Sequence, residues 1–192
     1  MKVTAEGWVD AAREALIADG LTGVRANRLA KSLGVTRGGF YYHFRNQQQL
    51  LDRLLEDWRN GDAFLPSDGA LDDAQEARAY LERAICGQSK RARASADFEQ
   101  AVREWGRVDA KVSEVVEKVD DERISRLTKV FAALGFNHEE AGIRARIFYF
   151  YQMGYYALGF QARDGEEGNG LNADRYLEIL CGTGQGNVPM TH

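Results

Sequence analysis

The sequence predicts an all-α protein, and three observations support this prediction. Apolar residues recur at helical spacing along most of the chain, strand-type alternation is absent over any useful length, and proline occurs only at positions 66 and 189. A chain of 192 residues can bury a substantial core, either as one unit or as a small domain joined to a larger one. We therefore expect about nine helices, arranged as an N-terminal three-helix unit, a linking helix and a C-terminal antiparallel bundle.

The first helix is predicted from about Thr4 to Asp19. Thr4 is a suitable N-cap, and Gly20 marks the end of the helix. Its apolar stripe consists of Trp8, Ala12, Ala15 and Leu16. This stripe is a core face, so we expect the helix to brace the two helices that follow it.

Residues 25–45 predict two short helices joined by a tight turn at Leu33-Gly34-Val35. Gly34 is where a helix would end in a left-handed residue, which glycine adopts at least cost. Thr36 is the expected N-cap of the second helix, with its hydroxyl accepting a hydrogen bond from a first-turn N–H. Two helices, a glycine turn and polar and basic residues at the start of the second helix describe a helix-turn-helix, which predicts DNA binding.

The charge pattern supports this interpretation. The whole chain has a formal net charge of −4, but residues 20–45 contain no Asp or Glu. The same stretch carries the cations Arg25, Arg28, Lys31, Arg37 and Arg45. Contacts with phosphate need a local basic surface whatever the sign of the total charge. A solvated basic face is the alternative, and the absence of acids over the whole stretch favours DNA binding.

A fourth helix is predicted directly after the helix-turn-helix. Asn46 and Gln49 form a capping box at its start. Its apolar face consists of Leu50, Leu51, Leu54, Leu55 and Trp58. Residues 61–72 then contain a proline, two glycines and three aspartates, which together mark a boundary between domains.

Beyond this boundary the chain predicts a helical bundle in which no charged residue is unambiguously internal. The middle of the 138–163 helix is apolar or aromatic on nearly every side, so it must be covered on more than one side. Gly154 and Gly159 would let another helix approach it closely. A homodimer that pairs residues 138–163 and 173–181 in a four-helix interface accounts for this pattern, and a helix that is merely central in one chain is the alternative. The expected helices are 73–92, 96–107, 109–135, 138–163 and 173–181.

Other functional classes find little support in the sequence. It shows no phosphate-binding glycine loop, nucleophile elbow or metal-ligand spacing, so we expect no catalysis, no metal and no cofactor. The longest nearly apolar run, Ile147 to Phe160, is too short and too interrupted to span a membrane, and no signal peptide is expected. Cys86 and Cys181 are expected to be reduced thiols of a cytoplasmic protein, with a redox-sensing pair as the alternative.

The segment from Gly20 to Leu51 resembles the DNA-binding domain of TetR-type transcriptional regulators. The most specific part is V-T-R-G-G-F-Y-Y-H-F at residues 35–44, with Leu50-Leu51 at the expected distance. The chain length and the all-helical remainder fit the same family. The resemblance implies a DNA-binding domain at residues 1–46, a linking helix at 47–62, and a regulatory, ligand-binding and dimerisation domain at 63–192.

The resemblance also implies which residues contact DNA. Recognition helices of this family make base contacts early and phosphate contacts late, so Arg37 is the first choice for a base contact, with guanine as its partner. Gly38 and Gly39 would bring the helix backbone close to the DNA, which explains a helix cost of about 1 kcal/mol for each glycine. Phe40 and Phe44 are expected to point into the core. The full set is Arg25, Arg28, Thr36, Arg37, Gly38, Gly39, Tyr41, Tyr42, His43, Arg45 and Gln47.

Three members of this set depart from the family pattern. Gly39 stands where a Thr, Ser or Ala is usual, which removes a side-chain contact. Arg25 stands where a capping Thr is common, so the helix start loses a cap and gains a cation. Gln47 stands where a Lys often meets the DNA backbone, so only a neutral hydrogen bond remains there.

In this family the larger domain holds a small-molecule pocket. The resemblance therefore implies a repressor that binds a palindromic operator as a dimer and is released by an effector. The alternative is a TetR-like regulator without a ligand, acting as an activator or through a protein partner. Residues that could line the pocket, although each is also consistent with plain core, are Tyr80, Phe98, Trp105, Tyr149, Gln152, Met153 and Tyr156.

Overall fold

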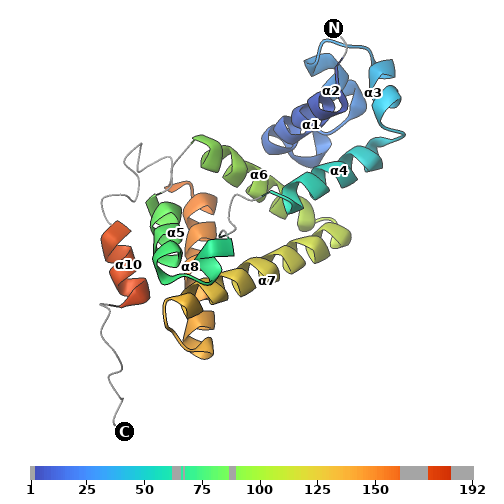
Figure 1. Ribbon diagram of the computed structural model, residues 1–192. Helices are drawn as coiled ribbons and strands as arrows, with labels where there is room; N and C mark the ends of the chain where they lie inside the picture. The colour runs from blue at the N-terminus through green and yellow to red at the C-terminus, as the bar shows by residue number, and fades with distance from the viewer. Residues whose placement is uncertain (1–2, 62–65, 67, 87–89, 161–172, 183–192) are drawn as a thin grey trace. The chain divides into compact units, whose positions relative to one another are not determined.

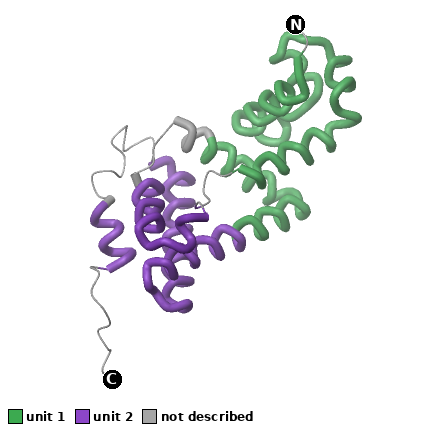
Figure 2. Tube along the Cα trace, viewed as in Figure 1, with its two compact units in different colours: residues 1–63, 94–120 green, residues 64–93, 121–192 purple. Residues whose placement is uncertain are grey.

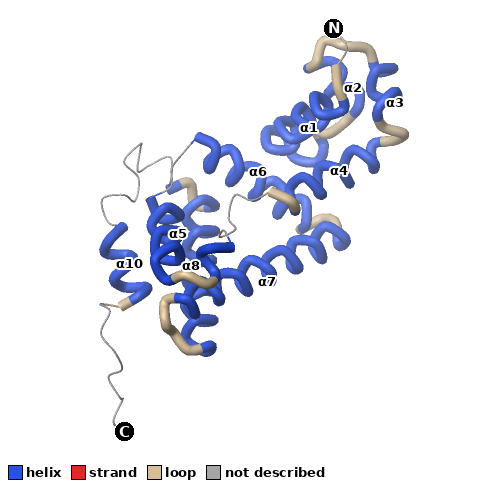
Figure 3. Tube along the Cα trace, in the orientation of Figure 1, coloured by secondary structure: helices blue, strands red, loops and turns tan. Residues whose placement is uncertain are grey.

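Helices make up all the regular secondary structure in the described part of the chain. The computed structural model describes residues 3–61, 66, 68–86, 90–160 and 173–182 (Figure 1). No strand occurs within these residues (Figure 3), which confirms the predicted all-α class. The elements are α1 (Ala5–Asp19), η1 (Gly20–Thr22), α2 (Ala26–Ser32), α3 (Arg37–His43), α4 (Gln47–Arg59), η2 (Asp68–Leu71), α5 (Ala74–Cys86), α6 (Lys90–Gly106), α7 (Ala110–Ala133), α8 (His138–Ala157) and α10 (Ala173–Cys181).

Two of the predicted helix caps are present. The N–H of Gly7 donates to Thr4 Oγ1 at 3.2 Å at the start of α1. The N–H of Gln49 donates to Asn46 Oδ1 at 2.9 Å at the start of α4. The reciprocal half of the predicted capping box is shifted by one residue, because Gln49 Oε1 accepts from the N–H of Arg45 rather than of Asn46.

Several helix boundaries differ from the predicted ones. α5 ends at Cys86 rather than near residue 92, and α6 begins at Lys90 rather than at 96. α8 ends at Ala157, because Gly159 adopts a φ of +69° in the left-handed region that ends helices. The prediction that Gly159 lies inside this helix was therefore wrong. Residues 161–163 of the predicted helix lie outside the described residues.

The chain forms two compact units, each drawn from segments that are far apart in the sequence (Figure 2). Unit 1 comprises residues 1–63 and 94–120, and unit 2 comprises residues 64–93 and 121–192. Unit 1 therefore combines α1–α4 with most of α6 and the first part of α7. This division by packing does not test the predicted functional boundary between residues 62 and 63, which remains a prediction.

The core of unit 1 surrounds buried tryptophans. Trp8 is fully buried and meets Phe40 edge to face, with ring centroids 5.4 Å apart. Burying one such large side chain stabilises a fold by about 1.5–3 kcal/mol or more. The same cluster includes Leu16, Leu29, Leu50, Leu54, Trp58, Phe98, Val102 and Trp105. α1 thus braces the helix-turn-helix as its apolar stripe predicts.

A partly buried polar cluster around the buried carboxylate of Glu99 joins α4, α6 and α7 within unit 1. Trp58 Nε1 donates to Glu99 Oε2 at 2.8 Å, and Arg103 Nε donates to Glu99 Oε1 at 2.9 Å. Arg103 also forms a two-pronged contact with Asp120, at 2.9 and 2.6 Å. Glu99 is 2% exposed and Arg123 in unit 2 is 3% exposed, so the expectation that no charged residue is internal was wrong.

Unit 2 has a separate apolar core and a polar tie between two of its helices. Its core includes Ala77, Leu81, Ile85, Leu127, Phe131, Phe148, Tyr149 and Leu177. Arg144 Nε on α8 donates to the carbonyl of Leu180 on α10 at 2.9 Å. None of the described helices is long and apolar enough to cross a bilayer.

One face of α8 is left uncovered by the described residues. Ile143, Ile147 and Phe150, which follow each other at helical spacing, are 51, 54 and 60% exposed. Gly154 continues this face, and a Cβ placed there would meet no described atom within 4 Å. On α10, Ile179 is 74% exposed. The described part of one chain therefore covers α8 on one side only.

The buried cluster predicts unequal effects from two matched substitutions. Glu99→Gln is expected to lower the free energy of unfolding by about 2 kcal/mol, because a buried charge-assisted hydrogen bond to Arg103 is lost. Glu82→Gln removes an exposed pair with Arg78 and is expected to change stability by less than about 0.5 kcal/mol. Urea denaturation followed by circular dichroism measures both values, and equal losses would contradict a stabilising role for the cluster.

Candidate nucleic-acid interface

α2 and α3 form the predicted helix-turn-helix. Gly34 between them has a φ of +66°, the left-handed conformation expected for the turn. Phe40 and Phe44 are buried, as predicted, and hold α3 against the core. Thr36 is the N-cap of α3, but its hydroxyl caps none of the described N–H groups. The N–H of Gly39 donates instead to the carbonyl of Thr36 at 3.0 Å, so the predicted side-chain cap was wrong.

The opposite side of α3 is exposed and bears aromatic and basic side chains. Tyr41 is 49% exposed and Tyr42 is 71% exposed, although aromatic residues of this size are usually covered. Arg37 Nη2 donates to Tyr41 Oη at 2.7 Å, and its guanidinium carbon lies 5.3 Å from the Tyr41 ring centroid. Tyr41 therefore holds the guanidinium of Arg37 beside the start of α3.

The other predicted cations flank this helix and are all exposed. Arg28 on α2 contacts Asp19 Oδ2 at 3.4 Å in a solvent-exposed pair, which is worth at most about 1 kcal/mol and can give way to a phosphate. Arg25 Nη1 donates to Gln47 Oε1 at 3.3 Å. Gln47 Nε2 in turn donates to the carbonyl of Val24 at 2.7 Å. The Gln47 amide thus orients Arg25 and fastens the start of α4 to the turn before α2.

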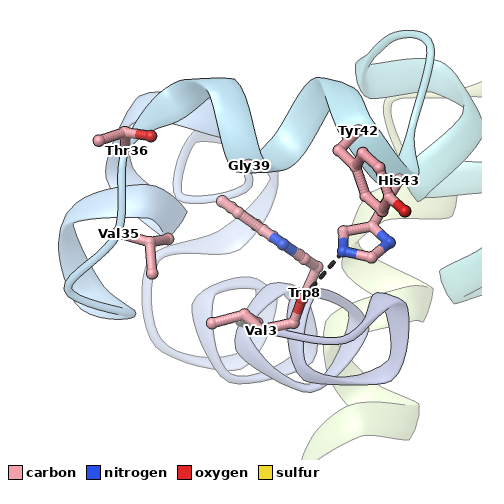
Figure 4. Close-up of a pocket in the computed structure, with 7 residues that line it drawn as sticks. All are labelled: Val3, Trp8, Val35, Thr36, Gly39, Tyr42 and His43. Atoms are coloured by element: carbon pink, nitrogen blue, oxygen red, sulfur yellow. Dashed lines mark hydrogen bonds between the residues drawn. The ribbon is translucent and has the colours of Figure 1, made fainter. Parts of the chain in front are cut away.

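A hollow of about 290 Å³ lies between α3 and the start of the chain (Figure 4). His43 Nε2 lies 2.9 Å from the carbonyl oxygen of Val3, and because a carbonyl only accepts, this nitrogen carries the proton. The bond ties the segment before α1 to the last turn of α3. Figure 4 shows Gly39 above the indole of Trp8, which forms the floor of the hollow. Its lining residues are Val3, Trp8, Val35, Thr36, Gly39, Tyr42 and His43.

Neither glycine of α3 is required by the packing of the described residues. A Cβ on Gly38 would lie 3.7 Å from Thr36 Oγ1, and one on Gly39 would lie 3.6 Å from Trp8 Cζ2, both ordinary contacts. Neither residue has the positive φ that demands glycine. Each glycine costs a helix about 1 kcal/mol relative to alanine. Packing within the described residues therefore does not explain why glycine occupies these two positions.

Comparisons with known proteins agree with this geometry. Residues 9–54 match the sequence model for "Bacterial regulatory proteins, tetR family". A curated relative from Pseudomonas putida, the "Uncharacterized HTH-type transcriptional regulator TtgW", is 35% identical over 54 residues. That match covers 28% of this chain and only 40% of the relative. The matched residues therefore form a TetR-type DNA-binding domain.

Solved structures of similar fold extend the likeness beyond the helix-turn-helix. A transcriptional regulator from Rhodococcus sp. Rha1 has a TM-score of 0.63 at 20% identity, covering 97% of this chain and 100% of that one. Salmonella enterica GusR has a TM-score of 0.65 at 14% identity, covering 92% and 94%. A tetR-family regulatory protein from Rhodococcus RHA1 has a TM-score of 0.64 at 16% identity, covering 95% and 98%. Because all three identities are below 25%, these matches show that the chain shares the fold of these proteins.

The predicted DNA-contacting residues all lie in unit 1, on α2, α3, the adjoining turns and the start of α4. Sequence reasoning missed two groups that position them. One is Asp19, which lies just outside the acid-free stretch and pairs with Arg28. The other is the carbonyl of Val3, which no sequence pattern distinguishes from any other carbonyl.

The residues predicted to line an effector pocket are divided between the two units. Phe98 and Trp105 lie in unit 1, and the other five lie in unit 2. In unit 2, Gln152 Nε2 donates to the carbonyl of Ala84 at 3.1 Å. Burial raises the pKa of the Tyr80 hydroxyl well above its usual value, although Arg123 opposes the shift. The effector pocket remains a prediction.

The described residues contain no group of His, Cys, Asp and Glu side chains that could hold a metal ion. Cys181 is a half-buried free thiol, and burial raises its pKa, which disfavours the reactive thiolate. The side chain of Cys86 lies outside the described part of the chain.

The glycines of α3 predict a gain in stability on substitution. Gly38→Ala and Gly39→Ala are each expected to raise the free energy of unfolding by about 0.5–1 kcal/mol, because alanine favours the helix and fits both positions. Gly34→Ala is the matched control, expected to lower stability by about 1–2 kcal/mol because its φ is left-handed. Urea denaturation gives all three values. A loss of stability in Gly39→Ala would show that Trp8 leaves no room there.

Proposed function

We propose that this TetR-type regulator is a repressor that binds a palindromic operator as a homodimer and is released by a small-molecule effector. The observation that carries the DNA-binding part is α3 itself. Its inner side packs Phe40 into the core. Its outer side combines exposed Tyr41, Tyr42 and Arg37 with two glycines that the packing does not require. A backbone free of side chains can approach the DNA closely.

The placement of side chains along α3 supports a division of roles. Arg37 stands in the first turn, where a recognition helix meets base edges, and its guanidinium suits guanine O6 and N7. Gly38 and Gly39 follow it. Tyr42 and His43 come later and border the hollow shown in Figure 4, a position that suits sugar and phosphate contacts. Arg25, Arg28 and Arg45 supply positive charge around them.

The exposed apolar face of α8 supports the homodimer. Ile143, Ile147 and Phe150 form one continuous strip, and exposed strips of this kind mark protein interfaces. Gly154 at the end of the strip would let a partner helix approach closely. α10 is tied to α8 through Arg144 and adds Ile179. A two-fold interface uses the same patch from both copies, which fits a strip on two adjacent helices.

Two observations support the effector part of the proposal. One is the resemblance to TetR-type regulators, and the other is the mixture of polar and apolar side chains inside unit 2. Gln152 and Tyr80 place polar groups among the aromatic side chains of that unit. A small-molecule site needs such a combination of apolar walls and a few polar groups.

Substitution of Arg37 tests the role proposed for α3 in base recognition. Arg37→Ala is expected to lose selective enrichment of operator fragments from a genomic DNA pool, because one bidentate contact to guanine discriminates by about 1–3 kcal/mol. Arg78→Ala, which removes an exposed arginine from α5, is the control and is expected to select the wild-type fragments. Sedimentation of both variants checks that the assembly state is unchanged. If Arg37→Ala selects the same fragments as the wild type, Arg37 is not the base-reading residue.

A further inference from the structure

The guanidinium of Arg37 makes two kinds of contact with the side chain of Tyr41. Arg37 Nη2 donates to Tyr41 Oη at 2.7 Å, and the guanidinium carbon lies 5.3 Å from the centroid of the Tyr41 ring. The two residues are four apart on α3, so their side chains lie on the same face of the helix. Both residues are exposed, so a large partner such as DNA can reach the pair.

The core beneath Tyr41 fixes the position of its ring. The ring meets Phe40 edge to face, with centroids 5.2 Å apart and planes at 89°. Phe40 is 1% exposed and in turn meets the fully buried Trp8 edge to face. A continuous line of aromatic contacts therefore runs from Trp8 to the exposed guanidinium of Arg37. These contacts restrict a side chain that otherwise has many rotamers and loses much entropy when it is ordered.

The contact with Tyr41 leaves Arg37 able to recognise a base. A guanidinium has five N–H donors, and the hydrogen bond to Tyr41 uses one hydrogen of Nη2. Whichever Nη2 hydrogen is used, one pair of parallel N–H groups remains, either Nη1 with Nη2 or Nε with Nη2. One such pair matches the O6 and N7 acceptors of guanine.

The partner of Arg37 also differs in charge from the partner of Arg28. Arg28 pairs with Asp19 Oδ2 at 3.4 Å, so a carboxylate offsets its charge. The hydroxyl of Tyr41 is neutral, and while it accepts from Arg37 its own hydrogen remains able to donate to a phosphate. Arg37 therefore keeps its full positive charge and has a defined orientation before it meets a base.

We propose that Tyr41 sets the base selectivity of α3 by positioning Arg37. It holds the guanidinium close to the orientation that guanine requires, so less side-chain entropy is lost when the bidentate contact forms. The role of Tyr41 thus goes beyond a contact with the DNA backbone. This inference rests on the DNA-binding part of the function proposed above and does not depend on an effector.

Tyr41→Phe tests the proposal, because it removes the hydroxyl and keeps the ring against Phe40. The readout is guanine discrimination, the factor by which a fragment selected by the wild type loses affinity when one G·C pair is exchanged for A·T. The pair used is the one at which Arg37→Ala reduces this factor most. Tyr41→Phe is expected to reduce it about three- to tenfold, the effect of ordering one rotamer-rich side chain. An unchanged factor would overturn the proposal and leave the proposed function standing.

Two further variants separate positioning from direct contact with DNA. Tyr42→Phe removes a hydroxyl from the neighbouring exposed residue, and is expected to weaken binding of both fragments equally, which leaves guanine discrimination unchanged. Arg37→Ala combined with Tyr41→Phe is expected to discriminate as Arg37→Ala does, because Tyr41 acts through Arg37. A further loss of discrimination in the double variant would show that Tyr41 recognises the base itself and would overturn the proposal.

A measurement without DNA distinguishes failure of this inference from failure of the proposed function. The NMR order parameter of Arg37 Nε in the full-length protein reports how restricted the guanidinium is on the ps–ns timescale. It is expected to be higher in the wild type than in Tyr41→Phe, with circular dichroism confirming that the variant is folded. Equal order parameters would overturn the positioning role, whether or not the protein binds DNA. A higher value in a wild-type protein that selects no DNA fragment would overturn the proposed function, and base selectivity with it.

Discussion

The packing of Phe40 against Trp8 is the contact on which the position of α3 and its exposed surface depend. α3 spans only Arg37–His43 and contains two glycines, so it is too short and too flexible to persist by itself in water. Phe40 and Phe44 fix one side of it to the core, and the hydrogen bond from His43 to the carbonyl of Val3 fixes its last turn. The exposed side carries Arg37, Tyr41 and Tyr42, which the proposed function assigns to DNA contacts.

The support for this surface continues through unit 1. Trp58 at the end of α4 donates to Glu99 on α6, and Arg103 extends the cluster to Asp120 on α7. A buried ionic cluster contributes less to net stability than to a defined geometry, because removing charges from water is costly. The cluster therefore gives α4 a fixed position relative to α6 and α7 inside the unit.

The sequence predicted local features better than pairings at long range. Helical periodicity, the caps at Thr4 and Asn46 and the left-handed Gly34 depend on neighbouring residues, and all are present. The spacing of Phe40 and Phe44 predicted which side of α3 faces the core. Glu99 could not be predicted as a buried carboxylate, because its partner Trp58 is far away in the sequence. The end of α8 at Ala157 was missed because Gly159 can serve either close packing or helix termination, and only its φ decides between them.

We propose that two copies of α3, held apart by one homodimer, bind one operator together. Hydroxyl-radical footprinting of a DNA fragment selected by the wild-type protein tests it most directly. We expect two protected patches related by two-fold symmetry, with centres about 34–36 Å apart, or one helical turn of DNA. A single patch, or two patches without that symmetry, would contradict the account.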